Sequence, residues 1–364
     1  MKEIWKFDLR YSEKEILNYQ KYSKEILKRG FLTESKYLNE FTSEFKNYQK
    51  LKYGVTVTSG TDALLAAFKA CLEPEDEIII PSNTFVATYI SAKLAGLKIK
   101  LSDVNPYDGM LDLQTLKKTI TNKTKAVCIV HIGGSVSSEI FDIKKYCKDK
   151  KILLFEDAAH SVGSEFKGVS AGNFGFMGCF SFFSTKSFTL GEGGFVSCQN
   201  LKSEKKLKSV KNFGRTRNQE DWHEELGFNM KVTELQAALG LIEIARSEDR
   251  INKRRRLFSQ YVAQINNKDI EILHTDRINE SSCYKIIMKA DKKLIRKIKT
   301  VFNENKIAMT GSVYSKQIGK HKAFKYEKEF LNSQSFIDSH FCPPLYPELE
   351  IKDINRVCKV LNDI

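Results

Sequence analysis

Between residue 54 and about residue 200, short apolar runs alternate with longer segments of helical periodicity. The runs are GVTVTSG (54–60), DEIIIP (76–81), LKIKLSDV (97–104), KAVCIVHIGG (125–134), KILLFED (151–157), GCFSFFS (178–184) and GGFVSC (193–198). Helical patterns occupy residues 61–72, 84–95, 112–121 and 139–149. This alternation predicts a mostly parallel sheet covered by helices on both faces, which is an α/β fold.

A region with a different pattern follows. After LGFNMKVTELQAALGLIEI (226–244) the helical periodicity continues to about residue 265, and shorter mixed elements then appear at IEILH (270–274), CYKIIMKA (283–290) and 292–305. We therefore expect a large α/β domain over residues 1–245, including an N-terminal helical segment, and a smaller α+β domain over residues 246–364. No segment rich in proline, glycine or serine marks the boundary.

The composition excludes several classes of protein. Hydrophobic residues make up 41% and charged residues 29% of the chain, a balance that is typical of folded proteins. No apolar stretch reaches the roughly 18 residues that a membrane helix needs. The N-terminal MKEIWKFDLRYSEKEI is too charged for a secretory signal, so we expect a cytoplasmic protein that does not associate with membranes.

Cysteine and charge patterns argue against two further kinds of site. The eight cysteines are scattered, with no CxxC pair, so we expect neither a metal site nor a disulfide framework. The net charge of +14 comes largely from lysines interleaved with acidic residues, and the one dense basic run, NKRRRLF (252–258), lies in a helical pattern. We therefore expect no nucleic-acid binding, although the charge is compatible with phosphorylated small molecules.

Polar side chains stand at the ends of two predicted strands. KILLFED finishes in Glu156 and Asp157, and FSFFSTK (180–186) finishes in Thr185 and Lys186. The carboxyl ends of strands in an open α/β sheet form the ligand-binding edge, and the spacing leaves room for a connection and one further strand. Asp157 and Lys186 can thus face one cleft, and an ordinary surface salt bridge is the alternative interpretation.

Two further segments suggest a ligand with a phosphate and a planar ring. Ser59, Gly60 and Thr61 come directly before an apolar helix, where free backbone N–H groups and the helix dipole favour a phosphate. A simple helix N-cap explains these three residues equally well. Phe85, in PSNTFVATYISA (81–92), could cover a planar ring, whereas alone it would be read as a core residue.

Together these residues meet the chemical needs of pyridoxal 5′-phosphate. That cofactor requires a lysine for a Schiff base, a carboxylate that keeps the pyridine nitrogen protonated, and a cup for its phosphate. Lys186 and Asp157 supply the first two groups. A partly desolvated cleft disfavours the ammonium form of a lysine, so Lys186 can be nucleophilic near neutral pH.

Six motifs resemble one known family. They are GFLTES (30–35), SGTDALLAA (59–67), DEIIIPSNTFVAT (76–88), FEDAAHSVGSEFKG (155–168), FSFFSTKSFTLGEGGFV (180–196) and LGFNMKVTELQAALG (226–240). In this order they resemble the DegT/DnrJ/EryC1/StrS aminotransferases, which are fold-type I pyridoxal-phosphate enzymes that mostly aminate keto sugars linked to nucleotides. The resemblance covers most of the first 245 residues, and it implies the same fold and cofactor for this chain.

The resemblance implies specific roles at the cofactor ring. Lys186 is similar to the Schiff-base lysine, and Asp157 to the residue that pairs with the pyridinium nitrogen. His160 occupies the place in EDAAH where the family usually has a glutamine or histidine against the cofactor ring or its oxygen. Phe85 would stack on the ring. A dehydratase branch of the family has histidine in place of the lysine, and Lys186 argues against that branch.

The resemblance also implies how the phosphate is held. Gly60 and Thr61 would bind it through backbone amides and a hydroxyl, next to Ser59, and Ser181 would add another hydroxyl. Asn229, in GFN, is similar to a residue that reaches the phosphate of the neighbouring subunit's cofactor. We therefore expect a homodimer with shared active sites.

Two segments depart from the family pattern. HIGGSVSS (131–138) lacks the tyrosine that the family often carries as HLYG near the substrate. In SVYSKQIGKHKAF (312–324), where the family commonly has a tyrosine and paired histidines, His321 is the candidate substrate-binding residue. These departures affect the expected substrate and leave the expected cofactor unchanged.

The expected function is transamination. The amino group would move from an amino acid, which we expect to be glutamate, to the keto group of a nucleotide-linked keto-deoxysugar used for surface-polysaccharide or glycoconjugate biosynthesis. One alternative is a small phosphorylated ketone such as dihydroxyacetone phosphate. Another is a non-catalytic sensor that binds pyridoxal phosphate without turnover, which the intact pair of Lys186 and Asp157 disfavours.

Overall fold

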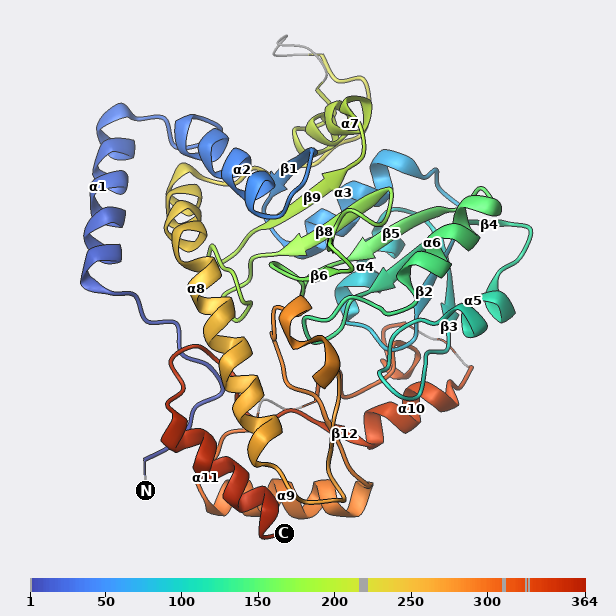
Figure 1. Cartoon of the computed structure of the whole chain (residues 1–364). Coiled ribbons are helices and arrows are strands. Elements are labelled where there is room, and N and C mark those ends of the chain that lie inside the picture. The colour runs from blue at the N-terminus through green and yellow to red at the C-terminus, as the bar shows by residue number, and fades with distance from the viewer. Residues whose placement is uncertain (1, 216–221, 310–311, 325, 327) are drawn as a thin grey trace.

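A seven-stranded sheet forms the centre of the larger part of the molecule (Figure 1). The computed structural model describes residues 2–215, 222–309, 312–324, 326 and 328–364. The strand order is β1-β9-β8-β5-β4-β2-β3. The strands are β1 (Tyr53–Val57), β2 (Glu77–Pro81), β3 (Lys98–Ser102), β4 (Thr124–Val130), β5 (Leu153–Asp157), β8 (Met177–Ser181) and β9 (Gly194–Cys198).

The directions of the strands confirm the predicted α/β class. The pairs β2/β3, β2/β4, β4/β5 and β5/β8 are parallel, and β9 runs antiparallel to both β1 and β8. All seven apolar runs identified in the sequence correspond to these strands, with ends that differ by a few residues. A short two-stranded ribbon, β6 (Glu165–Phe166) and β7 (Val169–Ser170), lies between β5 and β8 in the chain.

Helices cover both faces of the sheet. One face packs against α2 (Lys36–Tyr48), α5 (Leu113–Thr119), α6 (Ile140–Asp149) and the start of α8 (Glu234–Gln264). The other face packs against α3 (Gly60–Cys71), α4 (Val86–Leu94) and α7 (Leu201–Lys211). Because side chains alternate along a strand, Ile79 enters the first core while Ile78 and Ile80 enter the second.

The C-terminal part has its own core. It contains α9 (Lys292–Glu304), α10 (Leu331–Asp338), α11 (Ile351–Asn362) and a small antiparallel sheet of β10 (Glu271–Ile272), β11 (Met288–Lys289) and β12 (His340–Phe341). Short 3₁₀ turns, η1 (Thr275–Glu280) and η2 (Ile318–Lys320), complete it. Most of its buried side chains form one cluster that is separate from the two cores of the large sheet.

The long helix α8 joins the two parts (Figure 1). Its first turn is fixed by a capping box between Thr233 and Gln236. Ala237 and Ala238 pack in the core of the large sheet, whereas Leu257 packs in the C-terminal core. The predicted boundary at residue 245 therefore falls inside one continuous helix, which explains why no linker is visible in the sequence; the division into two domains stays a prediction.

The first residues of the chain pack against the C-terminal part. The chain enters near the C-terminal helix α11, and Ile4 forms a parallel β-bridge with Ile307 and belongs to the C-terminal core. From there the chain crosses to α1 (Glu13–Arg29), which lies against α8.

Two kinds of feature are absent from the described residues. In that part of the chain, no helix combines the length and apolar character needed to cross a membrane. The same residues contain no group of three or more histidine, cysteine, aspartate or glutamate side chains arranged to hold a metal ion. All eight cysteines are free thiols, and seven of them are buried.

Candidate active site

The end of β5 and the loop after β8 bring Lys186 and Asp157 together. The two strands are parallel neighbours, with Asp157 opposite Cys179. Asp157 is the last residue of β5, whereas β8 ends at Ser181 and the chain then turns, so that Lys186 N–H donates to Phe183 O at 2.9 Å. Lys186 therefore lies in a turn rather than on the strand itself, at the carboxyl edge of the sheet.

The environment of Lys186 favours the neutral amine. Burial is the main cause and lowers the pKa of its ammonium group, and the positive charge of Lys285 acts in the same direction. The nearby groups of Tyr284 and Asp157 oppose this shift without cancelling it. The Nζ atom lies 5.1 Å from the centroid of the Tyr284 ring. A neutral amine can act as a nucleophile and as a base.

Asp157 is a buried carboxylate held by two donors. Only 5% of the residue is exposed. Thr88 Oγ1 donates to Oδ2 at 2.8 Å, and Ala159 N–H donates to Oδ1 at 3.1 Å. Burial raises the pKa of Asp157, while these two hydrogen bonds and the charge of Lys186 act against that rise. A cationic N–H partner would stabilise the ionised form of such a carboxylate, because its charge offsets the free-energy cost of removing the carboxylate from water.

His160 lies between two tyrosine rings. Its ring centroid is 4.5 Å from that of Tyr284 and 6.0 Å from that of Tyr314. Burial, followed by the charges of Lys186 and Lys285, lowers the pKa of His160 well below its usual value, so the imidazole is neutral. Its Nδ1 atom is buried and has no hydrogen-bond partner among the residues that the structure describes. A buried ring nitrogen without a partner is expected where a ligand supplies one.

The start of α3 forms a close-packed turn against β8. The Ser59 side chain caps the helix, because Asp62 N–H donates to its Oγ at 3.0 Å. A Cβ atom added to Gly60 would lie 2.6 Å from the Cβ of Ser181, so only glycine fits this approach. The hydroxyl of Ser59 is thus used as a helix cap, which leaves the backbone amides of the first turn, with Thr61 and Ser181, as the groups able to hold a phosphate.

The residues present fit pyridoxal phosphate. A buried carboxylate, a lysine with a lowered pKa and a helix N-terminus lie at one edge of the sheet. Phe85, at the N-cap of α4, is 59% exposed, which is unusual for a phenylalanine and leaves one ring face available. The unpartnered Nδ1 of His160 offers a further polar contact. This donor set matches the charge and shape of the cofactor.

Two predicted residues lie apart from this group. Asn229 is exposed, its backbone pairs with Asn212, and its side chain makes no hydrogen bond within the described part of the chain. His321 contacts the ring of Phe324, which stacks on Tyr89 of α4. Among the described residues, no hydrogen bond, ion pair or ring contact joins His321 to Lys186. The roles predicted for both residues remain predictions.

Three residues of the site were not identified from the sequence. Thr88 lies inside a motif that was recognised, but nothing in the motif shows that its hydroxyl faces Asp157. Tyr284 precedes the short strand β11, and Tyr314 lies in an irregular segment. Neither tyrosine has a local pattern that distinguishes it from a core residue, so only the packing of the C-terminal part against the sheet places them beside His160.

The altered loop after β4 supports the segment that carries Tyr284. Lys285 N–H donates to Gly133 O at 2.9 Å, and Ser282 N–H donates to Gly134 O at 3.2 Å. A Cβ atom on Gly133 would lie 2.9 Å from Ile287 Cδ1. A tyrosine at this position, as in the family pattern, would have to displace the end of the Ile287 side chain. The loop and the C-terminal segment therefore depend on each other.

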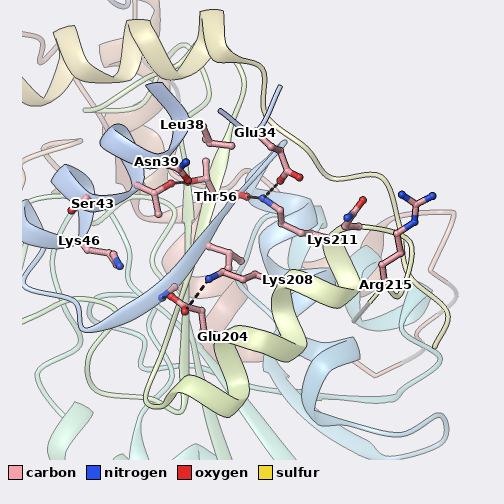
Figure 2. Close-up of a pocket in the computed structure, with 14 residues that line it drawn as sticks. Glu34, Leu38, Asn39, Ser43, Lys46, Thr56, Glu204, Lys208, Lys211 and Arg215 are labelled. Atoms are coloured by element: carbon pink, nitrogen blue, oxygen red, sulfur yellow. Dashed lines mark hydrogen bonds and ion pairs between the residues drawn. The ribbon is translucent and has the colours of Figure 1, made fainter. Parts of the chain in front are cut away.

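The pocket in Figure 2 lies at the open edge of the sheet, between α2, β1 and α7. Its volume is about 490 Å³. Lys211 Nζ lies 2.7 Å from Glu34 Oε1 and donates to Thr56 O at 3.2 Å, while Glu204 accepts from Gly54 N–H at 3.2 Å. No predicted site residue lines it. These charged side chains satisfy the free backbone groups of edge strand β1 and protect it from pairing with other strands.

Several known proteins are similar in sequence to this chain. GDP-perosamine synthase of Escherichia coli O157:H7 is 29% identical over 67% of this chain and 68% of its own length. The enzyme of the same name from Caulobacter vibrioides is 32% identical over 64% of each. The chain thus spans about two thirds of the length of these relatives. The spore coat polysaccharide biosynthesis protein SpsC of Bacillus subtilis is 28% identical over 93% of this chain and 92% of its own.

Solved structures share the fold. NtdA from Bacillus subtilis, solved with its bound cofactor PMP, superposes with a TM-score of 0.89 at 24% identity, covering 96% of this chain and 82% of NtdA. Helicobacter pylori PseC gives a TM-score of 0.90 at 22% identity, covering 99% and 98%. The model of the DegT/DnrJ/EryC1/StrS aminotransferase family matches residues 13–362. This chain therefore belongs to the DegT/DnrJ/EryC1/StrS aminotransferase family and depends on pyridoxal phosphate.

Proposed function

We propose that this aminotransferase moves an amino group from L-glutamate to the keto group of a nucleotide-linked keto-deoxysugar for surface-polysaccharide or glycoconjugate biosynthesis. The observation that carries the proposal is the buried Lys186, whose pKa is lowered, beside the buried carboxylate of Asp157. The reaction balances, because glutamate becomes 2-oxoglutarate while the ketone carbon of the sugar gains the amino group.

Each residue of the site has a separate role in the reaction. When bound, pyridoxal phosphate supplies a protonated ring that accepts the electron pair left by proton removal. Lys186 Nζ takes the proton from Cα of glutamate and returns a proton to the former ketone carbon of the sugar. Asp157 holds a proton at the ring nitrogen, and Thr88 keeps Asp157 oriented. The rings of Tyr284 and Tyr314, which both contact His160, exclude water from the reacting carbon.

The nucleotide-sugar substrate is supported by the relatives. Two are perosamine synthases named for a GDP-linked product, and another is named a UDP-N-acetyl-3-dehydro-alpha-D-glucosamine 3-aminotransferase, 30% identical over 63% of this chain. Binding energy from a remote nucleotide would also assist the step at the carbonyl, since that part of the substrate is not changed in the reaction. We therefore favour the nucleotide sugar over dihydroxyacetone phosphate.

Two other functions have less support. A 3-dehydratase of GDP-4-keto-6-deoxy-D-mannose from Escherichia coli O55:H7 is 29% identical over 75% of this chain. The family's dehydratase branch carries a histidine where this chain has Lys186, so dehydration is disfavoured. A sensor without turnover would not need a buried, neutral lysine next to a buried carboxylate, because burying both groups costs stability without a catalytic return.

The substrate can be identified by comparing ketones. The purified enzyme is saturated with glutamate, and kcat/KM is measured for GDP-, UDP- and dTDP-linked keto-deoxysugars and for dihydroxyacetone phosphate. We expect at least one nucleotide sugar to reach a kcat/KM on the order of 10⁴ M⁻¹s⁻¹. Turnover of the small phosphate alone at that level would overturn the proposal in favour of the triose.

We further propose a homodimer with shared active sites. Asn229 is exposed and lacks side-chain partners within the described residues, as a residue directed at a neighbour would. Exposed apolar side chains surround this segment: Leu226 is 84% exposed and Phe213 40%, and Phe31 and Leu32 are also exposed. Exposed apolar side chains of this size are commonly buried against another subunit.

Mixed subunits test this arrangement. Lys186→Ala subunits are combined with Asn229→Ala subunits, each inactive or nearly so alone. If Asn229 serves the neighbouring site, each hybrid dimer has one site with both defects and one intact site, so up to half of the wild-type activity per dimer returns. Proven subunit exchange with no recovery of activity would refute the shared site. A cytoplasmic location stays a prediction, which cell fractionation tests.

A further inference from the structure

A small cationic pocket lies beside the reactive lysine. Its volume is about 190 Å³, and it is bordered by Lys6, Phe7, Thr185, Arg254, Tyr284, Lys285, Pro343 and Leu345. Three of these residues are cations, and none is an acid. The pocket is therefore a site of positive charge in which the lining itself provides no carboxylate to balance the cations.

Arg254 is the most unusual member of this lining. Only 4% of it is exposed. Its Nη1 atom donates to three main-chain oxygens, of Leu345 at 2.8 Å, Tyr284 at 3.4 Å and Cys283 at 3.5 Å. Its Nε atom is buried without a partner, and no carboxylate of the described residues forms an ion pair with it. Burial, followed by the charge of Arg250, lowers its pKa to about 10.

Other arginines on the same helix are neutralised. One turn earlier on α8, Arg250 forms an ion pair with Glu348. Arg246, a further turn back, pairs with Glu15 at 3.2 Å and with Glu243 at 3.1 Å. Arg246 and Arg250 are therefore paired with carboxylates, whereas Arg254, which is the most deeply buried of the three arginines that follow them, has no ion pair among the described residues. A buried guanidinium that lacks a carboxylate is costly unless a ligand provides the anion.

Tyr284 connects this pocket to the reactive centre. The face of its ring lies against Lys186 Nζ, its side chain hydrogen-bonds that of Thr185, and its main-chain oxygen accepts from Arg254. Lys186 itself does not line the pocket. A group bound in the pocket is therefore next to the reactive centre without bordering Lys186, which suits the far end of a short substrate better than a carboxylate on its reacting carbon.

The size of the pocket limits its ligand. About 190 Å³ is below the roughly 300–1,000 Å³ of typical sites for larger ligands, so a nucleotide does not fit. A carboxylate on a short aliphatic chain does fit, and the planar fork of an arginine matches a carboxylate well. The apolar side chains of Phe7 and Leu345 can cover the methylene groups of such a chain.

We propose that this pocket binds the side-chain carboxylate of the amino-acid donor through Arg254 and Lys6, and so selects glutamate over donors with one carboxylate. This rests on the proposed transamination from glutamate, and it names the residues that would produce that preference. Lys6 comes from the N-terminal segment that packs on the C-terminal core through Ile4, so this segment would be part of the donor site.

The main test compares two donors in the half-reaction that loads the amino group onto the cofactor. This step is followed by the absorbance of the bound cofactor and requires no keto sugar. For Arg254→Lys we expect kcat/KM for glutamate to fall on the order of 10- to 100-fold, while kcat/KM for alanine changes less than about threefold. Arg256→Met is the matched control, because Arg256 is exposed on the same helix, and both donors should react normally.

A second variant avoids any effect of Arg254 on folding. Lys6 is exposed, and Lys6→Glu places a carboxylate where the donor's carboxylate would bind. Compared with Lys6→Gln, it should lower kcat/KM for glutamate by a further tenfold or so through like-charge repulsion. Binding of glutarate, which has two carboxylates and no amine, should weaken in parallel when measured by calorimetry.

The possible outcomes separate the two proposals. Equal losses with glutamate and alanine in folded Arg254→Lys and Lys6→Glu would overturn the side-chain assignment. A raised KM for the nucleotide sugar with normal glutamate kinetics would also overturn it and assign the pocket to the sugar's diphosphate. A wild-type enzyme that reacts with glutamate but with no keto sugar would instead refute the proposed acceptor and leave the donor pocket supported.

Discussion

Replacing Thr88 with valine tests how strongly the site depends on the ionised form of Asp157. Thr88 Oγ1 lies 2.8 Å from Asp157 Oδ2 and 2.7 Å from Thr84 Oγ1. Because the single hydroxyl proton of Thr88 goes to the carboxylate, Thr84 must be the donor to Thr88. The two threonines thus form a chain of hydrogen bonds that ends on Asp157, and valine keeps the shape of Thr88 while breaking the chain.

The size of the effect follows from the charge of the acceptor. A hydrogen bond to a charged group contributes about 1.5–3 kcal/mol, and about 1.4 kcal/mol corresponds to a factor of ten. Burial already raises the pKa of Asp157, and loss of the Thr88 bond raises it further. We therefore expect the rate of the glutamate half-reaction to fall roughly 10- to 100-fold, and the acid limb of its pH profile to move to higher pH.

The assay is stopped-flow absorbance of the bound cofactor between about pH 5.5 and pH 9, a range that extends to both sides of neutral pH. Thr84→Val is the graded control, since it removes only the bond to Thr88 and should cost no more than about tenfold. Thermal melting of each variant confirms that the fold is retained. A Thr88→Val enzyme within about threefold of wild type, with an unchanged acid limb, would refute the role of this hydrogen-bond chain.

Three further predictions follow from buried groups. Lys186→Ala should abolish turnover while the cofactor still binds non-covalently. The melting temperature of the variant should equal or exceed that of wild type, because a desolvated amine is removed. Normal turnover by the purified variant would contradict this prediction. Gly60→Ala should raise the dissociation constant for pyridoxal phosphate by roughly 5- to 100-fold, since the Cβ of the alanine would lie 2.6 Å from that of Ser181. Unchanged affinity in a cofactor titration would show that this close packing does not shape the phosphate site. His340 accepts from Val313 N–H at 2.9 Å through Nε2, and burial lowers its pKa from 6.5 to about 4. Its neutral form therefore contributes stability above pH 6.5, and this contribution is lost as the pH falls toward 4. Over that range the free energy of unfolding of wild type, measured with denaturant, should fall by about 3 kcal/mol more than that of His340→Gln. Parallel pH profiles for the two proteins would contradict the prediction.

Local sequence patterns were sufficient for the sheet and its ligand-binding edge. The apolar runs are strands because alternate residues enter the two cores, as Ile79 and Ile80 do. Asp157 and Lys186 could be assigned to one edge because parallel strands place their carboxyl ends together. The turn at Gly60 could be assigned as well, because a cap followed by an apolar helix is a short-range signal.

Contacts between distant segments could not be predicted in this way. Thr88 and Asp157 are 69 residues apart, and Arg254 meets the carbonyl of Leu345 91 residues further on. Each of these side chains sits in a sequence pattern that a plain helix or loop would also show. Arg254 in particular lay in a basic run that suggested only a helix, whereas its burial without a carboxylate depends on how α8 packs against the C-terminal part.

The sequence by itself determined the α/β architecture and the cofactor class, and it predicted the two residues at the centre of the site. The tertiary structure decided how Asp157 is held, which rings enclose His160, and where an unbalanced cation lies beside Lys186. The physical reason is the separation in sequence between the residues that interact. Periodicity and capping arise between residues a few positions apart, whereas hydrogen bonds and desolvation in the site depend on which remote segments the packed cores bring into contact.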